Sequence, residues 1–400
     1  MLHILSVILI FFVLLAVLVL THELGHFLAA RWLGIAVEEF GFGLPPRLVG
    51  LVKVKGKKKP AHWKILRSNA SVRMFKDRIL SPIYSLNAIP FGGFVKILGE
   101  DGEKREDPTS FAAQPARKRF IILFAGILMN FILGAFLFSA GFWYGSPEIA
   151  DDNMAVKDPK VQVTFVAPNS PAEKAGFKIG DTIKNIGLPA NTKVPIDKVN
   201  TVQSLAKEWA GEEIIFEVLR GNDVYRLKIQ PRVSPPAGQG ALGIELARIG
   251  IFKYSAWEAL KMGPVRSAQL IWIMTDYFRD IIGKLIQAEK VQVDVSGPVG
   301  IIVVTNQMKE MGFSYLIQFA AIISVNLAFL NFLPFPALDG GRILFLAIEK
   351  IKGRPVSPRL EGAIHAIGLY FLLALMVLIT FKDVSRFRDK FEMMWERIVK

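Results

Sequence analysis

The sequence has no cysteine among its 400 residues and only five histidines. The lack of cysteine excludes disulfides, iron–sulfur clusters, thiol nucleophiles and thiolate metal ligands. Any metal site must therefore be built from imidazole and carboxylate groups. Acidic residues are also in the minority, with 35 Asp and Glu against 49 Lys and Arg, so the formal net charge is +14.

Four stretches of the sequence have no charged residue at all. They lie within residues 4–20, 120–140, 315–338 and 363–381. About 20 predominantly apolar residues are enough to cross a bilayer as a helix. We therefore predict a polytopic α-helical membrane protein with about four transmembrane helices, at 1–30, 119–142, 315–338 and 363–381. The first run lacks the charged start and the cleavage site of a signal peptide, so we expect it to be retained.

The excess of basic residues fits loops that orient the chain and contact lipid headgroups, and we expect no nucleic-acid partner. The segment between the first two apolar runs is rich in Lys and Arg, whereas none precedes the first run. We therefore expect this segment in the cytoplasm and residues 142–314 outside an inner membrane. The basic tail at 382–400 argues against this orientation, but early spans usually dominate.

Two connecting regions have their own patterns. Residues 31–118 contain short apolar runs at 48–52 and 94–98 between Gly and Pro, which predicts membrane-associated β-hairpins. Residues 241–312 are predicted to be an amphipathic helical linker, with an apolar face from Leu270 to Leu285. This face could pack on protein or lie on the membrane surface. The tail at 382–400 suggests a second, shorter amphipathic helix.

Residues 159–233 read as a compact α+β module. Its PAEKAG segment has Pro at the start of a short helix and Gly just past the end. The pattern S-P-A-x-x-A-G-x-x-x-G-D-x-I, from Ser170 to Ile183, resembles a PDZ domain of the bacterial, circularly permuted kind. A generic small β-sandwich is the alternative.

The strongest chemical motif is His22-Glu23-Leu24-Gly25-His26, at the end of the first apolar run. Residues four apart on a helix stand one above the other, so both imidazoles can reach one ion. Glu23 lies beside them and is free to hold a water. Unpaired polar groups at membrane depth are costly and are functional by default. We therefore favour a metal site over two capping or core histidines.

A catalytic zinc needs three protein ligands and an open position. His3 is about 28 Å from the motif at 1.5 Å per residue, and His62 lies in the basic loop. His365 is not excluded by spacing. Asp339 follows two prolines that break the third apolar run, and a carboxylate at such a break is costly without a cation. We therefore consider Asp339 the best third ligand.

The two signatures together, H-E-x-x-H and N-x-x-P-x-x-x-L-D-G from Asn331, resemble the bacterial site-2 protease family of intramembrane metalloproteases, which includes the sigma-E regulating protease. The resemblance implies that His22, His26 and Asp339 bind Zn2+, that Glu23 is the general base and that Asn331 binds the substrate backbone. Segments 91–96 and 296–300 extend it. The family's A-G-P-x-x-N-F lacks its proline here, and only one PDZ module is evident. Asn130 is interpreted as a helix-packing amide.

The expected function is therefore an intramembrane zinc endopeptidase that cleaves transmembrane segments of single-span membrane proteins, such as anti-sigma factors or signal-peptide remnants. A prior site-1 protease acting on the same substrate is a further expected partner. One alternative is a non-catalytic membrane-anchored PDZ scaffold, against which Glu23 and Asp339 argue. Another is a metal-coupled transporter, but no inverted repeat is visible. A soluble zincin with an anchor would not carry its motif inside a span.

Overall fold

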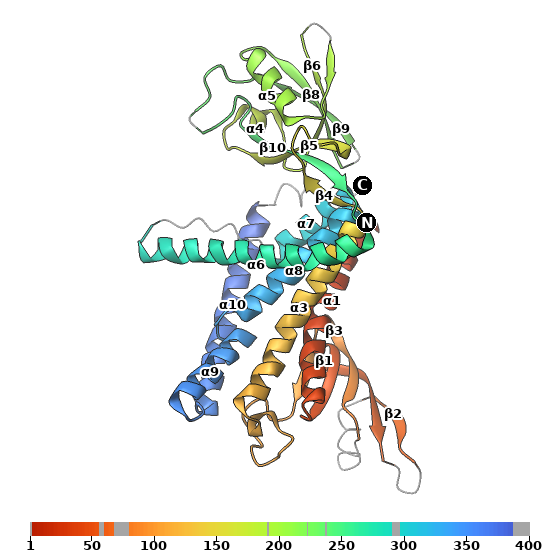
Figure 1. The fold of residues 1–400 in the computed structure, drawn as a ribbon, viewed down its shortest axis with the longest axis vertical. Coiled ribbons are helices and arrows are strands. Elements are labelled where there is room, and N and C mark those ends of the chain that lie inside the picture. The colour runs from red at the N-terminus through yellow and green to blue at the C-terminus, as the bar shows by residue number, and fades with distance from the viewer. Residues whose placement is uncertain are drawn as a thin grey trace. The chain divides into compact units, whose positions relative to one another are not determined.

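The computed structural model describes residues 2–55, 60–67, 80–189, 192–221, 223–236, 238–289 and 297–386. It divides into two compact units (Figure 1). The first comprises Met1–Phe138, Gly263–Thr305 and Phe319–Lys400, and the second Ser139–Met262 and Asn306–Gln318. The elements in chain order are α1 Leu2–Trp32, β1 Val37–Val54, β2 His62–Leu66, β3 Ile83–Ile97, η2 Phe111–Ala113, α3 Ala116–Tyr144, β4 Ser146–Ile149, β5 Lys157–Val166, α4 Pro171–Ala175, β6 Thr182–Gly187, β7 Lys193–Pro195, α5 Val199–Glu208, β8 Ile214–Arg220, β9 Asp223–Ile229, β10 Ile244–Phe252, α6 Ala256–Ile286, α7 Pro298–Met311, α8 Phe313–Phe332, α9 Asp339–Lys352 and α10 Pro358–Arg386.

Four of the described helices are long and apolar enough to cross a membrane. They are Leu5–Trp32 in α1, Ala116–Tyr144 in α3, Phe313–Phe332 in α8 and Pro358–Ser385 in α10. This agrees with the predicted polytopic helical protein. The third span ends at Phe332 rather than at residue 338, because Pro334 has no amide hydrogen and disfavours helical backbone at the residue before it.

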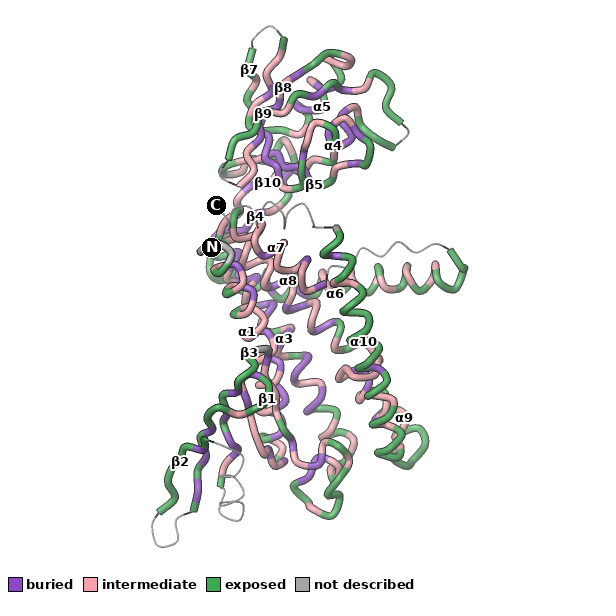
Figure 2. Tube along the Cα trace, turned by 180° about the vertical axis from the view of Figure 1, so that it is seen from behind, coloured by how far each residue is buried: buried purple, intermediate pink, exposed green. Residues whose placement is uncertain are grey.

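Small residues let the first three spans pack closely. A Cβ added to Gly25 on α1 would lie 2.3 Å from the carbonyl oxygen of Ala125 on α3. A Cβ on Gly134 of α3 would lie 2.5 Å from a methyl group of Val325 on α8. Glycine at a helix contact allows this approach in membranes. By contrast, α10 is exposed along most of its length, and only 6% of the residues in its most apolar stretch are buried (Figure 2).

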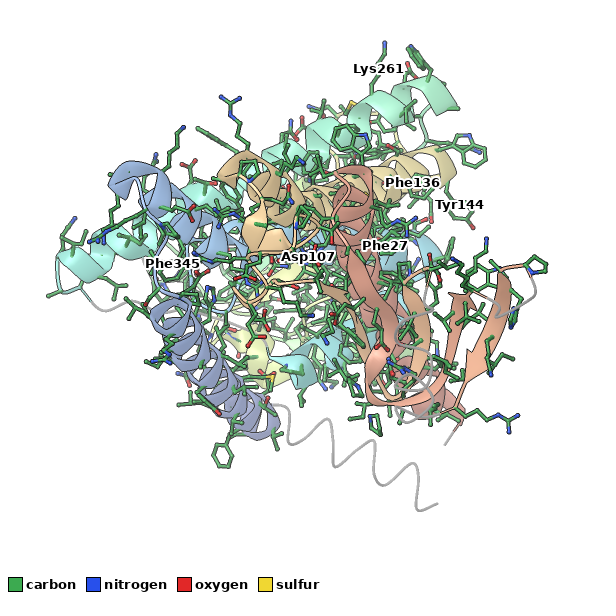
Figure 3. All side chains as sticks on the ribbon, turned by 90° about the horizontal axis from the view of Figure 1, so that it is seen from below. Phe27, Asp107, Phe136, Tyr144, Lys261 and Phe345 are labelled. Atoms are coloured by element: carbon green, nitrogen blue, oxygen red, sulfur yellow. The ribbon has the colours of Figure 1, made fainter. Side chains whose placement is uncertain are left out.

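The β-hairpin region forms a sheet beside α1. Its strand order is β2-β1-β3, and β1 pairs with both halves of β3. Gly41, for example, pairs with Ser85 on one side and Phe94 on the other. Residues 93–97 therefore form an outer strand among the described strands. Phe27 lies on α1 (Figure 3) and packs its ring against Phe40 of β1, with centroids 4.9 Å apart, so it holds the sheet against the helix.

The end of the last span is tied to the start of α7. Asp383 near the end of α10 is 2% exposed. Its Oδ2 accepts hydrogen bonds from the backbone N–H groups of Gly297 and Gly300, each at 2.8 Å. Both donors are free because the first N–H groups of a helix have no partner within it. The 296–300 segment, of which Ser296 lies outside the described residues, thus begins a helix that α10 caps.

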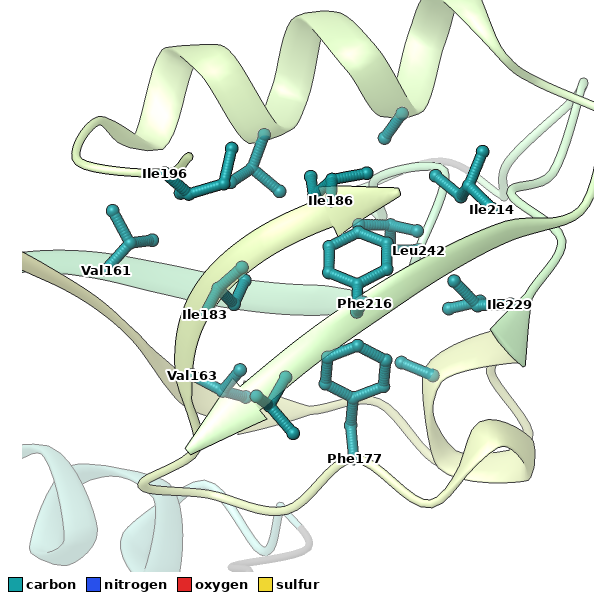
Figure 4. Close-up of a cluster of buried hydrophobic side chains, with 14 residues drawn as sticks. Val161, Val163, Phe177, Ile183, Ile186, Ile196, Ile214, Phe216, Ile229 and Leu242 are labelled. Carbon is teal, nitrogen blue, oxygen red and sulfur yellow. The ribbon is translucent and has the colours of Figure 1, made fainter. Parts of the chain in front are cut away.

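The second unit contains a seven-stranded sheet of order β4-β10-β5-β6-β8-β9, with β7 paired to β6. Helix α4 starts at Pro171, and the Ser170 hydroxyl accepts from the N–H of Glu173 at 3.1 Å. Gly176, with φ of 86°, ends it. Both ends agree with the sequence prediction. The core of the unit is a cluster of buried apolar side chains around Phe216 and Phe177, whose ring centroids are 5.3 Å apart (Figure 4).

The predicted helical linker at 241–312 is wrong at its start, because residues 244–252 form strand β10. This strand pairs with β5 on one side and β4 on the other, so the sheet extends beyond 159–233. An unpaired β5 edge would expose backbone groups, and β10 satisfies them. Arg248 fixes the strand by donating to the carbonyl oxygens of Asp197, Asp151 and Met154 at 2.7–2.9 Å.

The rest of the predicted linker contains α6 and α7. On the apolar face of α6, Met274 and Phe278 are half-buried, whereas Tyr277 and Leu285 are exposed. Phe278 packs its ring against Phe329 of α8, with centroids 5.8 Å apart. This face therefore contacts protein at some positions and leaves others uncovered. The predicted amphipathic tail falls mostly outside the described residues, since these end at 386.

Candidate active site

The three predicted ligands lie close together, although more than 300 residues separate Asp339 from the two histidines in the sequence. His22 and His26 lie on α1, and Asp339 is the first residue of α9. The two Nε2 atoms are 3.2 Å apart. They lie 3.0 Å and 3.4 Å from Oδ2 of Asp339. All three side chains are largely buried, with exposed fractions of 10%, 8% and 17%.

This arrangement fits a tetrahedral divalent cation. Zinc bonds of roughly 2.0–2.1 Å at tetrahedral angles place neighbouring ligand atoms about 3.3 Å apart. The three measured separations, 3.0–3.4 Å, agree with that spacing. In addition, Oδ2 of Asp339 is buried and has no hydrogen-bond partner among the described residues. A buried carboxylate oxygen that points at two imidazole nitrogens is satisfied by a cation.

Helix α3 provides a polar contact to the Nδ1 atom of each imidazole. Nδ1 of His26 is 2.8 Å from the carbonyl oxygen of Ile122 and can only donate to it. This leaves Nε2 of His26 unprotonated and able to bind a metal. A Cβ on Gly126 would lie 2.4 Å from that nitrogen, so no other residue fits there. Nδ1 of His22 lies 3.3 Å from the amide of Asn130.

Glu23 is oriented by the outer strand of the sheet. Its Oε2 accepts from the backbone N–H of Val95 at 3.0 Å. Together with the three ligands it lines a cavity of about 140 Å³. The other walls are mainly apolar, including Val95, Ile97, Phe111, Ile122 and Leu123. A carboxylate fixed beside the cation site in this cavity is placed to take a proton from a water.

A short loop brings Asp339 to the histidines. It follows α8 and contains Ala337 in the left-handed region, with φ of 77°. The N–H of Ala337 donates to Nδ1 of His365 on α10 at 2.9 Å. The ring of Phe345 on α9 packs against the same imidazole, with centroids 5.5 Å apart. His365, which spacing left open as a ligand, thus holds the loop instead of joining the cluster.

Two charged groups complete the cavity wall. Arg342 on α9 forms an ion pair with Glu100. Burial favours the neutral form of this guanidinium, but the charge of Glu100 outweighs it and raises the pKa of Arg342. Burial likewise opposes ionisation of Asp339, yet the two imidazoles in their protonated, metal-free form outweigh it and lower the pKa of this carboxyl. The cavity therefore contains an anionic ligand and a fixed cation.

The structure does not bring Asn331 into this cavity. It lies on α8, one residue before the helix ends, and is half-buried. It is not among the residues that line the cavity.

The structure also shows several contacts that were not predicted from the sequence, namely those of Ile122, Asn130 and His365. Only the position of Asn130 and His365 inside apolar runs could have signalled them.

Two histidines four apart on an apolar helix, a carboxylate that meets them and a glutamate beside them define a metal-dependent hydrolase of the membrane. Residues 10–375 match peptidase family M50, and the chain belongs to this family.

Its relatives include a protein named "Putative zinc metalloprotease" in Clostridium perfringens. The two are 34% identical over 92% of this chain and 95% of the relative. A protein of the same description in Brucella suis is 30% identical over 94% of each chain. The "Zinc metalloprotease RasP" of Shouchella clausii is 33% identical over 69% of this chain and 61% of its own length.

Proposed function

We propose that this protein is a zinc endopeptidase that cleaves membrane-anchored proteins within their transmembrane segments. The observation that supports it most is the convergence of His22, His26 and Asp339 beside Glu23, on and next to a span that is apolar up to the motif. The names of the M50 relatives support zinc as the metal. Anti-sigma factors and signal-peptide remnants are the substrate candidates.

In this proposal Glu23 moves the protons. A zinc ion held by His22, His26 and Asp339 would supply a Lewis acid. Glu23 takes a proton from the attacking water and passes it to the leaving amine. The Val95 N–H keeps one carboxylate oxygen in place. The other oxygen is then free to face the water.

A substrate helix must unwind locally before it can react, because its carbonyl groups are engaged in the helix. The freed segment can then pair with an exposed sheet edge. The outer strand at 93–97 suits this role because its residue Val95 contacts Glu23 directly. Asn331, which has both a donor and an acceptor, is proposed as a second contact for the freed backbone.

The central test compares the wild type with Glu23→Gln. Each full-length chain is co-expressed with candidate single-span proteins, and cut positions are determined by mass spectrometry. We expect cleavage within the apolar segment and a rate lower by about 10²–10⁴ in the variant. The zinc content of both purified proteins should be equal, because Gln leaves the three ligands in place. Identical fragments from both proteins would instead indicate a scaffold without catalysis.

We further propose that the sheet of the second unit is a PDZ domain outside the inner membrane, and that it excludes substrates with bulky outer domains. A prior site-1 protease would then make substrates accessible. The pattern from Ser170 to Ile183 supports this, since it forms a capped helix and a following strand.

Deleting residues 153–242 leaves β4 and β10 as a hairpin. We expect the deletion to permit cleavage of uncut substrates, and continued resistance would refute the filter.

A further inference from the structure

Asn130 is a buried amide whose side chain faces a metal ligand. It lies on α3 and is 0% exposed. Its amide nitrogen is 3.3 Å from Nδ1 of His22, and its other polar side-chain atom, Oδ1, has no partner within the part of the chain that the structure describes. Its backbone carbonyl oxygen accepts from the Ser324 hydroxyl of α8 at 2.7 Å, which fixes the helix at this position. The side-chain amide is thus available for a hydrogen bond with His22.

The chemistry of a metal ligand decides which amide atom must face the imidazole. A neutral imidazole carries one N–H, so a histidine that binds a cation through Nε2 carries its proton on Nδ1. That N–H needs an acceptor. His26 has one in the carbonyl oxygen of Ile122. For His22 the only polar group at Nδ1 among the described contacts is Asn130.

The two ends of the amide differ in what they allow. An NH2 group directed at Nδ1 makes that nitrogen an acceptor and leaves the proton on Nε2, where it blocks the metal. Turning the amide by 180° exchanges its oxygen and nitrogen with little change of shape. The carbonyl oxygen then accepts from Nδ1–H, and Nε2 faces Asp339 and His26 with a lone pair.

We propose that Asn130 is a positioning residue for the metal site: its carbonyl oxygen accepts from Nδ1–H of His22 and fixes the tautomer that binds the cation. This inference rests on the proposed zinc site. Helix α3 then orients both histidines, one through a backbone carbonyl at Ile122 and the other through a side chain two turns further along. Gly126, between them, leaves room for the imidazoles.

The test measures zinc affinity in three full-length variants purified in detergent, by competition with a chelator of known affinity. Asn130→Leu removes the acceptor and should weaken zinc binding 10- to 100-fold. Asn130→Asp keeps an acceptor of the same shape and should stay within about threefold of the wild type. Ser324→Ala, the matched control, removes a hydrogen bond to the same residue without touching His22, and should leave the affinity unchanged.

A purely structural role predicts the opposite order. A packing amide tolerates Leu, whereas Asp would bury a carboxylate without a donor and lower both the metal-free unfolding temperature and the affinity. That order, or equal affinities in all variants, would overturn the inference. A wild-type protein that binds no zinc would overturn the proposed function itself. The two failures are therefore distinguishable, and neither measurement depends on peptidase activity.

Discussion

The two units differ in where they leave apolar side chains exposed and polar ones buried. In the second unit, Ile186 and Phe216 are 0% exposed and form a closed core. In the first unit, polar residues such as Asn130 and Ser324 are 0% exposed, whereas Val13 on α1 is 54% exposed. Water drives apolar groups inward, but lipid does not, so the spans associate through small residues and hydrogen bonds.

This difference explains why the candidate site lies where it does. In the second unit the buried polar groups find partners within the unit: Asp181, which is 0% exposed, forms an ion pair with Arg220. In a bundle of spans the interior is the one place where polar groups avoid lipid. Imidazoles, carboxylates and amides can therefore gather around a cation in the first unit without displacing an apolar core.

The largest predicted effect tests the apolar core of the second unit. Phe216→Ala should destabilise this unit by about 3–5 kcal/mol, because it removes a ring from a packed cluster. Limited proteolysis of the full-length protein, with mass spectrometry of the fragments, measures it. Zinc affinity should not change, since all three ligands lie in the first unit. A parallel loss of zinc would show that the two units are not energetically separate.

A matched pair of valines sharpens the comparison. Val13 on α1 and Val224 on β9 are 54% and 64% exposed. Val13→Lys should cost about 2.5–3.5 kcal/mol in membrane insertion, whereas Val224→Lys on a water-exposed strand should change stability by less than about 0.5 kcal/mol. Because the chain has no cysteine, labelling of single introduced cysteines reports insertion directly. Equal tolerance of both changes would contradict the assignment of α1 to the bilayer.

The smallest predicted effect concerns the most exposed span. His365→Leu removes the acceptor of the Ala337 N–H and should cost about 1 kcal/mol. Because this loop positions Asp339, we expect zinc affinity to fall by a factor of about two to ten. His365→Gln retains a side-chain acceptor and serves as the control. An unchanged affinity in His365→Leu would mean that the loop keeps its position without α10.

Local patterns were sufficient to predict part of the site. The spacing of His22, Glu23 and His26 fixes their common helix face, and a carboxylate beside a broken helix indicated Asp339. The same prolines end α8 at Phe332, although the sequence analysis extended the span to 338. The role of Asn331 stays a prediction.

Contacts between distant segments had no local signature. Asn130 meets His22 across 108 positions, and its amide looks the same in sequence whether it packs a helix or holds a ligand. Strand β10 was missed for a similar reason. The predicted module ended at residue 233, but the free edge of β5 required one more strand from beyond it.

The carboxylate of Asp383 has a practical consequence for altering the C-terminal end. It connects the last span to the start of α7 through hydrogen bonds from two backbone N–H groups, each with an N–O distance of 2.8 Å. A fusion or truncation made after residue 386 keeps these two hydrogen bonds. A truncation that removes residue 383 takes away the cap of α7 and one attachment of α10. The same helix α10 carries His365, which accepts a hydrogen bond from the loop that positions Asp339. Changes at the far end of the chain can thus reach the metal centre.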